Sequence, residues 1–269
     1  MNGLGYRLPK TETFELQASR SGKNYRIFVS VPAKPAPADG YPILYALDGN
    51  ACFASLAEAM RLQSRHPLGL EPGLIVGIGY DTGEPFETNR RFYDFTTPAS
   101  PSGTRPDGSP WPETGGAEAF LSFIENELKP EIERRYPVDR ERQALFGHSL
   151  GGFFVLHTLL EQPDAFRFYI AGSPSVWWDE SVLLKRLPEW RKHAHEGKPD
   201  NRIQLMIGVG AEEKQNMVEG AKQAYGLLAP LESCGMRVAF ELFDGEGHVS
   251  VIHPLISRML RFVFQPADR

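Results

Sequence analysis

A serine stands in a glycine-rich turn near the middle of the chain. Residues 143–160 read QALFGHSLGGFFVLHTLL and contain the pattern Gly-x-Ser-x-Gly at 147–151, between a short apolar strand and an apolar helix. Small residues at these positions let neighbouring backbone approach closely, so that a tight turn can present the serine hydroxyl at the edge of a sheet. Ser149 is therefore predicted to be a nucleophile, with the N–H of Leu150 stabilising the oxyanion that it would form.

Such a serine needs a base, which in enzymes of this type follows the nucleophile and the acid along the chain. His248 lies in the stretch FDGEGHVSVIHP, directly after the last expected strand. A parallel sheet delivers a residue at that place to the same edge as Ser149, so His248 is the predicted base. His253 is the alternative, five residues further on and inside the expected final helix.

The carboxylate that would orient the base has three candidates. The strand IQLMIGVG ends at Gly210 and is followed by Glu212 and Glu213, and only one of these adjacent side chains can face an imidazole. We predict Glu213, with Glu212 next and Asp179 as a third candidate after the preceding strand. Acidic residues here could also simply begin a helix, where they complement its dipole. A dyad of Ser149 and a histidine without a carboxylate stays open.

A second donor to the oxyanion is expected in the loop after the third strand, LYALDGNACF. Gly49 permits close approach there, and the N–H of Asn50 would point at the site from the start of the next helix. Asp48 is interpreted as a turn or cap residue, because it precedes Ser149 in the chain.

The elements that would position these residues alternate between strands and helices, which predicts one α/β domain spanning 1–269. Its sheet is open and mostly parallel, with helices on both faces, and an antiparallel hairpin at the N-terminus is joined by the turn SRSG. Strands are expected at 13–17, 25–31, 43–47, 74–78, 143–146, 166–171, 203–209 and 238–243. Helices are expected at 51–64, 116–136, 150–161, 214–233 and 249–263.

One segment fits neither pattern. Residues 81–115 have no usable periodicity and contain six prolines, so we expect a long loop insertion. It begins after a buried strand, at the edge where open α/β sheets place their ligands. A functional loop is the favoured interpretation, and a surface insertion without function is the alternative.

Composition excludes several classes of function. The net charge of −5, without a basic stretch, argues against nucleic acid as a partner. No apolar run approaches the roughly 20 residues of a membrane-spanning helix, and the first residues carry no visible export signal. The two cysteines lie far apart, which argues against a disulfide framework or a zinc site. A cytoplasmic protein is the expectation.

Five motifs together resemble a known family. LDGN, NRRFYDFT, GHSLGGFF, SPSVWW and GEGHVSV occur in this order over 11–264. They are similar to the esterase-D-like α/β-hydrolases, and most closely to the esterases that open catecholate siderophore trilactones such as enterobactin, salmochelin and bacillibactin. The resemblance implies the α/β-hydrolase fold and a serine ester hydrolase that works through an acyl-enzyme, without a metal or organic cofactor.

The resemblance also implies a substrate and residues that bind it. The substrate would be a small-molecule ester such as a ferric catecholate siderophore, and Arg90 and Arg91 match the position of the family's substrate-binding arginine. A guanidinium suits anionic, oxygen-rich rings. Trp177 and Trp178 could form an aromatic wall, although at least one of them is expected to be a core residue. A general carboxylesterase, an acyltransferase and an inactive binding protein of the same fold are the alternatives.

Overall fold

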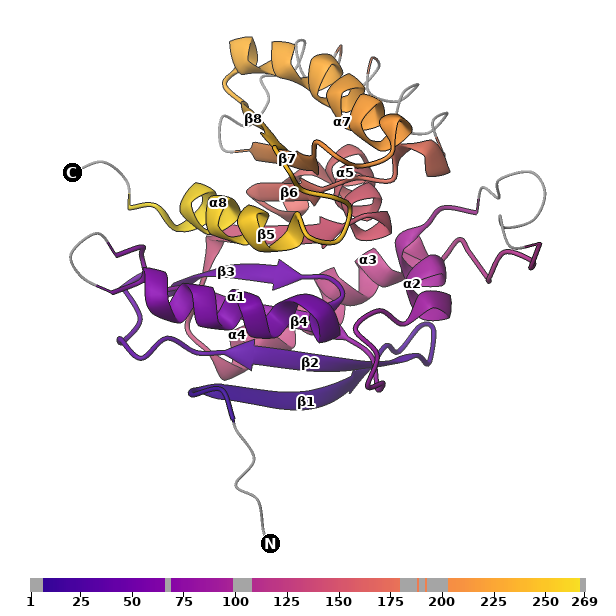
Figure 1. The fold of residues 1–269 in the computed structure, drawn as a ribbon. Helices are drawn as coiled ribbons and strands as arrows, with labels where there is room; N and C mark the ends of the chain where they lie inside the picture. Colours follow the sequence, from indigo (N-terminus) through magenta and orange to yellow (C-terminus); the bar gives the residue numbers. More distant parts are fainter. Residues whose placement is uncertain are drawn as a thin grey trace, which may run out of the picture.

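An eight-stranded sheet runs through the centre of the molecule (Figure 1). The computed structural model describes residues 7–65, 69–98, 108–179 and 203–266, together with Pro188 and Lys192. The strands are β1 (Thr11–Gln17), β2 (Asn24–Ser30), β3 (Tyr41–Ala46), β4 (Leu74–Gly79), β5 (Val138–His148), β6 (Phe168–Gly172), β7 (Gln204–Gly210) and β8 (Arg237–Phe243).

The strand order is β1-β2-β4-β3-β5-β6-β7-β8. β1 pairs with β2 and β2 pairs with β4 in antiparallel fashion, whereas every pairing from β4 through β3 to β8 is parallel. The hairpin turn contains Gly22 at φ 67°, a conformation that glycine adopts without strain. The predicted mostly parallel sheet and the N-terminal antiparallel hairpin are therefore confirmed.

Helices cover both faces of the sheet, as predicted. α1 and α8 pack on one face and lie in front of the sheet in Figure 1, while α3, α4, α5 and α7 pack on the other face. The bounds are α1 (Gly49–Gln63), α2 (Thr88–Phe95), α3 (Ala117–Phe123), α4 (Lys129–Arg135), α5 (Leu150–Glu161), α7 (Gln215–Leu228) and α8 (Ile252–Phe264). Short 3₁₀ turns lie at Pro163–Ala165, Val176–Trp178 and Ala229–Cys234.

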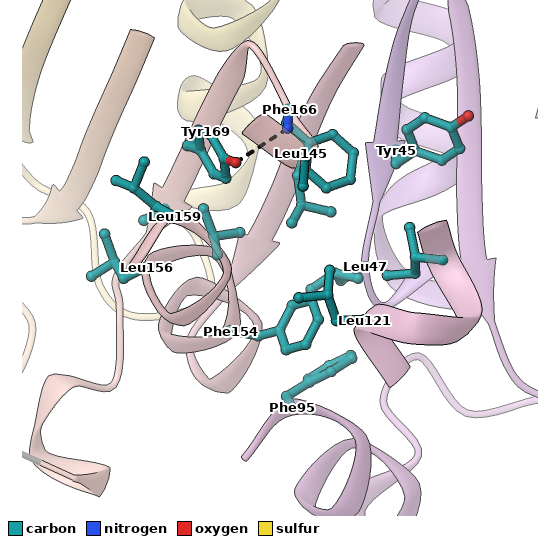
Figure 2. Packing of buried hydrophobic residues seen from close by; sticks show 14 of the residues in the cluster. Tyr45, Leu47, Phe95, Leu121, Leu145, Phe154, Leu156, Leu159, Phe166 and Tyr169 are labelled. Carbon is teal, nitrogen blue, oxygen red and sulfur yellow. Dashed lines mark hydrogen bonds between the residues drawn. The ribbon is translucent and has the colours of Figure 1, made fainter. Parts of the chain in front are cut away.

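Two apolar cores result from the alternation of side chains along the strands. In β3, Tyr45 joins the core under α3 and α5, whereas Leu44 joins the core under α1 and α8. Figure 2 shows part of the first core, where Phe154 of α5 lies between Leu145 of β5 and Phe95 of α2. α5 is buried along almost its entire length, so the helix that follows Ser149 is held firmly against the sheet.

The segment 81–115 differs from the expectation, because its described part contains the helix α2. The buried face of α2 carries Asp94 between Phe92 and Phe95, and a buried carboxylate interrupts the apolar periodicity that predicts helices. Asp94 accepts a hydrogen bond from the Tyr25 hydroxyl at 3.0 Å. Burial raises the pKa of Asp94 to about 6, although the Arg90 guanidinium opposes this rise. Residues 99–107 lie outside the described part.

The helix predicted at 116–136 is divided by a π-helical turn at Ile124–Leu128. Pro130 lies at the start of α4, directly after this turn. A proline inside a helix has no N–H to donate and its ring crowds the preceding turn, so a wider turn at this place accommodates it. In the described residues, no helix combines the length and apolarity that crossing a membrane requires.

Candidate active site

Ser149 lies in a strained turn between β5 and α5. Its backbone has φ 60° and ψ −116°, a conformation that is unfavourable for a residue with a side chain. Gly147 and Gly152 make the turn possible, because a Cβ atom at either position would lie within 2.6 Å of a carbonyl oxygen. A Cβ at Gly151 would meet only ordinary contacts, the nearest at 3.5 Å from Leu47. Two of the three glycines are thus sterically required.

The structure brings Ser149, His248 and Glu213 into one hydrogen-bonded chain. The Ser149 Oγ lies 3.0 Å from His248 Nε2, and His248 Nδ1 lies 2.6 Å from Glu213 Oε2. With Nδ1 donating to the carboxylate, Nε2 is free to accept the serine proton. The loop after β8 places His248 at the same edge of the sheet as the turn at 147–151, called the elbow from here on, which is the placement expected from the sequence.

Glu213 is held by donors on both of its oxygens. Besides His248 on Oε2, the Ser173 hydroxyl lies 2.5 Å and the Gly210 N–H 2.9 Å from Oε1. Burial opposes ionisation of this carboxyl, but the hydrogen bonds from His248, Ser173 and Gly210 outweigh it and hold the pKa of Glu213 below its usual value. The carboxylate is therefore ionised and fixed in orientation at neutral pH.

The competing residues lie elsewhere. Glu212 is exposed, and Asp179 accepts a hydrogen bond from the Thr97 hydroxyl at 3.2 Å. His253 lies in α8, where its Nε2 is 3.4 Å from the Ser55 hydroxyl. These positions favour Glu213 and His248 over the alternatives that the sequence left open.

The two residues predicted to donate to the oxyanion both lie in the first turn of a helix. Leu150 is the first residue of α5 and Asn50 the second residue of α1, and amides at such positions have no acceptor within their own helix. The side chain of Asn50 is used otherwise: its amide donates to the carbonyl oxygens of Tyr80 and Thr82 at 3.0 and 3.1 Å. Donation by the two backbone N–H groups stays a prediction.

Arg90 and Arg91 are engaged within the protein. Arg90 donates to the carbonyl oxygen of Asn24 at 3.2 Å and lies over the ring of Tyr25, at 4.9 Å from its centroid. Arg91 forms a bidentate ion pair with the buried Asp48, at 3.0 and 2.9 Å. Substrate binding by these arginines stays a prediction, and their contacts favour structural roles.

The two tryptophans separate into a pocket residue and a core residue. Trp177 is 36% exposed, whereas Trp178 is buried with its ring centroid 5.7 Å from that of Trp111. Trp177 and Trp111 belong to a pocket of about 540 Å³ over the catalytic candidates. Its lining residues are Trp111, Ser149, Ser175, Trp177, Glu213, Lys214, Asn216, Met217 and His248.

Sequence reasoning missed several residues of this site. The Ser175 hydroxyl lies 3.3 Å from the Ser149 hydroxyl, and Ser173 binds Glu213. Both serines follow β6, which neighbours β5 in the sheet, so the strand-end rule that led to His248 could have found them. Lys214 follows the end of β7 and fits the same rule, whereas Trp111 carries no comparable signal, because it does not follow a strand.

His148 is an uncharged neighbour of the candidate base. Its ring centroid lies 4.7 Å from that of His248, and it is almost fully buried. Burial lowers the pKa of His148 to about 3, and the nearby His248 and Arg91 act in the same direction. A neutral His148 therefore adds no positive charge beside His248 at neutral pH.

Metal-ligating side chains do not gather in the described part of the chain. No group of three or more His, Cys, Asp or Glu residues there could hold a metal ion. The acidic residue of the site, Glu213, has both oxygens engaged by donors.

A strained serine at the end of the fifth strand contacts a histidine, and that histidine contacts an acid, both from later strand ends. This arrangement defines a serine hydrolase of the α/β-hydrolase fold. Comparison with known proteins shows to which family within this class the chain belongs. Residues 18–248 match the Esterase family model, and the chain belongs to this family of ester hydrolases.

Two named relatives and one solved structure are similar to this chain over at least four fifths of each chain. The chain is 46% identical to the ferri-bacillibactin esterase BesA of Bacillus subtilis, over 97% of this chain and 92% of the relative. It is 38% identical to a siderophore enterobactin esterase of Emericella nidulans, over 82% and 81% of the two chains. The crystal structure of the BES protein from Bacillus cereus matches with a TM-score of 0.91 and 37% identity, covering 98% of this chain and 99% of that one.

Ser173 offers a first test of the site. Its φ of 41° is unfavourable for serine, and its hydroxyl binds Glu213. We expect Ser173→Ala and Ser173→Gly each to lower kcat by about 3- to 10-fold, because both remove a hydrogen bond to a charged group. The glycine variant should melt at the higher temperature of the two, since glycine relieves the backbone strain.

Kinetics on p-nitrophenyl butyrate and melting curves of both variants provide the measurement. Similar losses of kcat with separated melting temperatures would show that the hydroxyl, and not general stability, matters. A glycine variant with full kcat would contradict the positioning of Glu213 by Ser173.

Proposed function

We propose that the chain hydrolyses the trilactone backbone of a catecholate siderophore, with Ser149 as nucleophile, His248 as base and Glu213 as orienting acid. The observation that carries the catalytic part is the hydrogen-bonded chain Ser149–His248–Glu213 beside an open pocket. The names of the relatives support the substrate, since one acts on ferri-bacillibactin and another is an enterobactin esterase. The cytoplasmic location expected from the sequence stays a prediction.

In the first half of the reaction, Ser149 Oγ attacks the ester carbonyl while its proton passes to His248 Nε2. The carbonyl oxygen becomes an oxyanion, which the N–H groups of Leu150 and Asn50 stabilise. Glu213 stabilises the imidazolium that has formed. The tetrahedral intermediate collapses, the alcohol leaves with the proton from His248, and an ester between Ser149 and the acyl group remains.

In the second half, water replaces the alcohol. His248 Nε2 removes a proton from the water, whose oxygen attacks the acyl carbon and forms a second tetrahedral intermediate. Its collapse breaks the bond to Ser149 Oγ, which regains a proton from His248. One ester bond and one water are consumed, and one carboxylic acid and one alcohol are released.

The pocket supplies groups that suit a catecholate. Trp111 and Trp177 have ring centroids 6.4 Å apart and present aromatic surface, and Met217 adds apolar surface. Lys214 lines the same pocket, and no ion pair between it and another described residue is seen. A cation beside aromatic surface favours an anionic ring by charge and by stacking. Lys214, rather than Arg90 or Arg91, is the cation that the geometry favours for this role.

Hydrolysis of a trilactone tests the proposed substrate directly. The protein is incubated with enterobactin or bacillibactin, with and without iron, and the linear products are separated and quantified. p-Nitrophenyl butyrate serves as the reference ester. Turnover of the reference ester without turnover of either trilactone would leave a general carboxylesterase and contradict the siderophore proposal.

Replacement of Lys214 tests the recognition of charge. We expect Lys214→Gln to lower kcat/KM on ferric enterobactin, relative to the neutral reference ester, by about 3- to 10-fold, because one partly exposed charge-assisted contact is lost. The effect should shrink as salt is added, since salt screens exposed charges.

Lys222→Gln provides the matched control, because Lys222 is an exposed lysine on α7, the helix that Lys214 directly precedes, and does not line the pocket. Both variants are measured on both substrates. The ratio of kcat/KM on ferric enterobactin to kcat/KM on the reference ester is then compared. An equal change of this ratio in the two variants would mean that overall charge, and not the pocket cation, determines the preference for the charged substrate.

A further inference from the structure

Arg91 links the turn after β3 to the elbow that holds Ser149. Its Nε and Nη2 donate to the two oxygens of Asp48, at 3.0 and 2.9 Å. The same Nη2 lies 3.3 Å from the carbonyl oxygen of His148, the residue before Ser149. One guanidinium therefore joins the β3–α1 turn to the β5–α5 turn.

The surroundings of Arg91 are those of an internal group. Its side chain is 12% exposed and that of Asp48 only 1%. The rings of Phe86 and Phe95 flank the guanidinium, with centroids 5.1 and 5.8 Å away. Arg91 is not among the residues that line the pocket over Ser149. A role in binding substrate charge therefore finds no support in its position.

Arg91 joins the two turns at the point where the direct pairing of β3 with β5 ends. The N–H of Leu47 donates to the carbonyl oxygen of Phe146 at 2.9 Å, and this bond comes one residue before Asp48 and two before His148. Beyond this bond, the segments that follow β3 and β5 diverge and enter α1 and α5. Asp48 has φ 49°, and its side chain does not cap α1. Its carboxylate instead accepts the hydrogen bonds from Arg91. Burial raises the pKa of Asp48, and Arg91 opposes this rise.

The other side of the β3–α1 turn is fixed against β4. A Cβ atom at Gly49 would lie 2.9 Å from the backbone of Gly77, so the turn is seated closely on that strand. The Asn50 side chain donates to the carbonyl oxygens of Tyr80 and Thr82. The turn is thus anchored to β4 by its own residues and to the elbow by Arg91.

We propose that Arg91 is a positioning residue that sets the distance between the N–H groups of Asn50 and Leu150, and thereby the geometry of the oxyanion hole. The inference rests on the proposed role of these two amides and does not depend on which ester is the substrate. Charge on the carbonyl oxygen develops in the transition state, so a displaced donor lowers kcat more than it raises KM.

The test compares Arg91→Gln with Arg142→Gln on the neutral ester p-nitrophenyl butyrate. Arg142 is the matched control, because it is also a partly buried arginine in an ion pair, 2.7 Å from Glu71, but lies on β5 well before His148 and does not line the pocket. We expect Arg91→Gln to lower kcat by about 10- to 100-fold with KM within about twofold, since one displaced donor costs less than one removed. Arg142→Gln should stay within about twofold of wild type in both parameters.

A transition-state analogue separates positioning from loss of structure. Butylboronic acid forms a tetrahedral adduct with a serine hydroxyl and places an oxygen in the oxyanion hole, so its Ki should rise in step with the fall of kcat. Melting curves define a temperature at which every variant is folded. Arg91→Lys keeps the positive charge beside Asp48, so it serves as the second variant if Arg91→Gln does not fold, and we expect it to show a smaller loss of the same kind.

Two results would overturn the proposal. Unchanged kcat on the neutral ester, with a raised KM on ferric enterobactin alone, would make Arg91 a substrate ligand. A lower kcat with an unchanged Ki for the boronic acid would place the defect outside the oxyanion hole. Because the assay uses a neutral ester, it remains decisive even if the protein does not hydrolyse a trilactone.

Discussion

Ser149→Ala is expected to lower kcat on p-nitrophenyl butyrate by about 10⁴- to 10⁶-fold while the protein stays folded, because the three proposed catalytic residues act as a unit. Alanine removes only the hydroxyl, and the strained φ of 60° is the same for both residues. The melting temperature should therefore change little. The measurement is steady-state kinetics of the purified variant, together with a melting curve.

Labelling with a fluorophosphonate provides an independent check, since the reagent reacts with activated serines. Wild type should be labelled and Ser149→Ala should not. Ser122→Ala serves as the control, because Ser122 lies on α3 and does not line the pocket. Retention of a tenth of wild-type activity in pure Ser149→Ala would contradict the assignment of the nucleophile.

Glu213→Gln is expected to lower kcat by about 10²- to 10⁴-fold, because an amide at this position imposes the wrong tautomer on His248. Oε1 accepts hydrogen bonds from Ser173 and Gly210, so the amide oxygen of glutamine would take that place. Its NH₂ group would then face His248 Nδ1 and donate to it. Nε2 would carry the imidazole proton and could no longer accept one from Ser149.

Glu212→Gln is the matched control, because Glu212 is adjacent in sequence, carries the same charge and is exposed. It should stay within about twofold of wild type. Both glutamine variants are compared on the same neutral ester, with Asp179→Asn beside them. Normal activity of Glu213→Gln together with a strong loss in Asp179→Asn would move the acid to the end of β6.

The positions of the candidate nucleophile and base were predictable because local sequence dictates them. A tight strand-to-helix turn needs glycine at the positions where backbone would meet a side chain, as at Gly147 and Gly152. A parallel sheet brings the carboxyl ends of its strands to one edge, so a histidine that follows the last strand, such as His248, is expected near Ser149. The choice between Glu212 and Glu213 depended on the direction of side chains in a single turn, and the sequence favoured the residue that the structure places beside His248.

Contacts between distant segments were not predictable in this way. Arg91 and Asp48 are separated by 43 positions, and nothing in either motif indicates that they form a buried pair. The helix α2 was not predicted from the sequence, because Asp94 occupies its buried face. Periodicity assumes that buried positions are apolar, and this assumption fails where a charged residue is buried with its partners.

Asp48, Ser149 and Ser173 all have positive φ angles, and they follow the ends of three neighbouring strands, β3, β5 and β6. Each such residue costs the folded state on the order of 1–3 kcal/mol. Selection for heat resistance would therefore favour glycine at these places, whereas selection for turnover retains the side chains. The most economical route to a more heat-resistant enzyme leaves this edge of the sheet unchanged and improves the opposite end of the molecule.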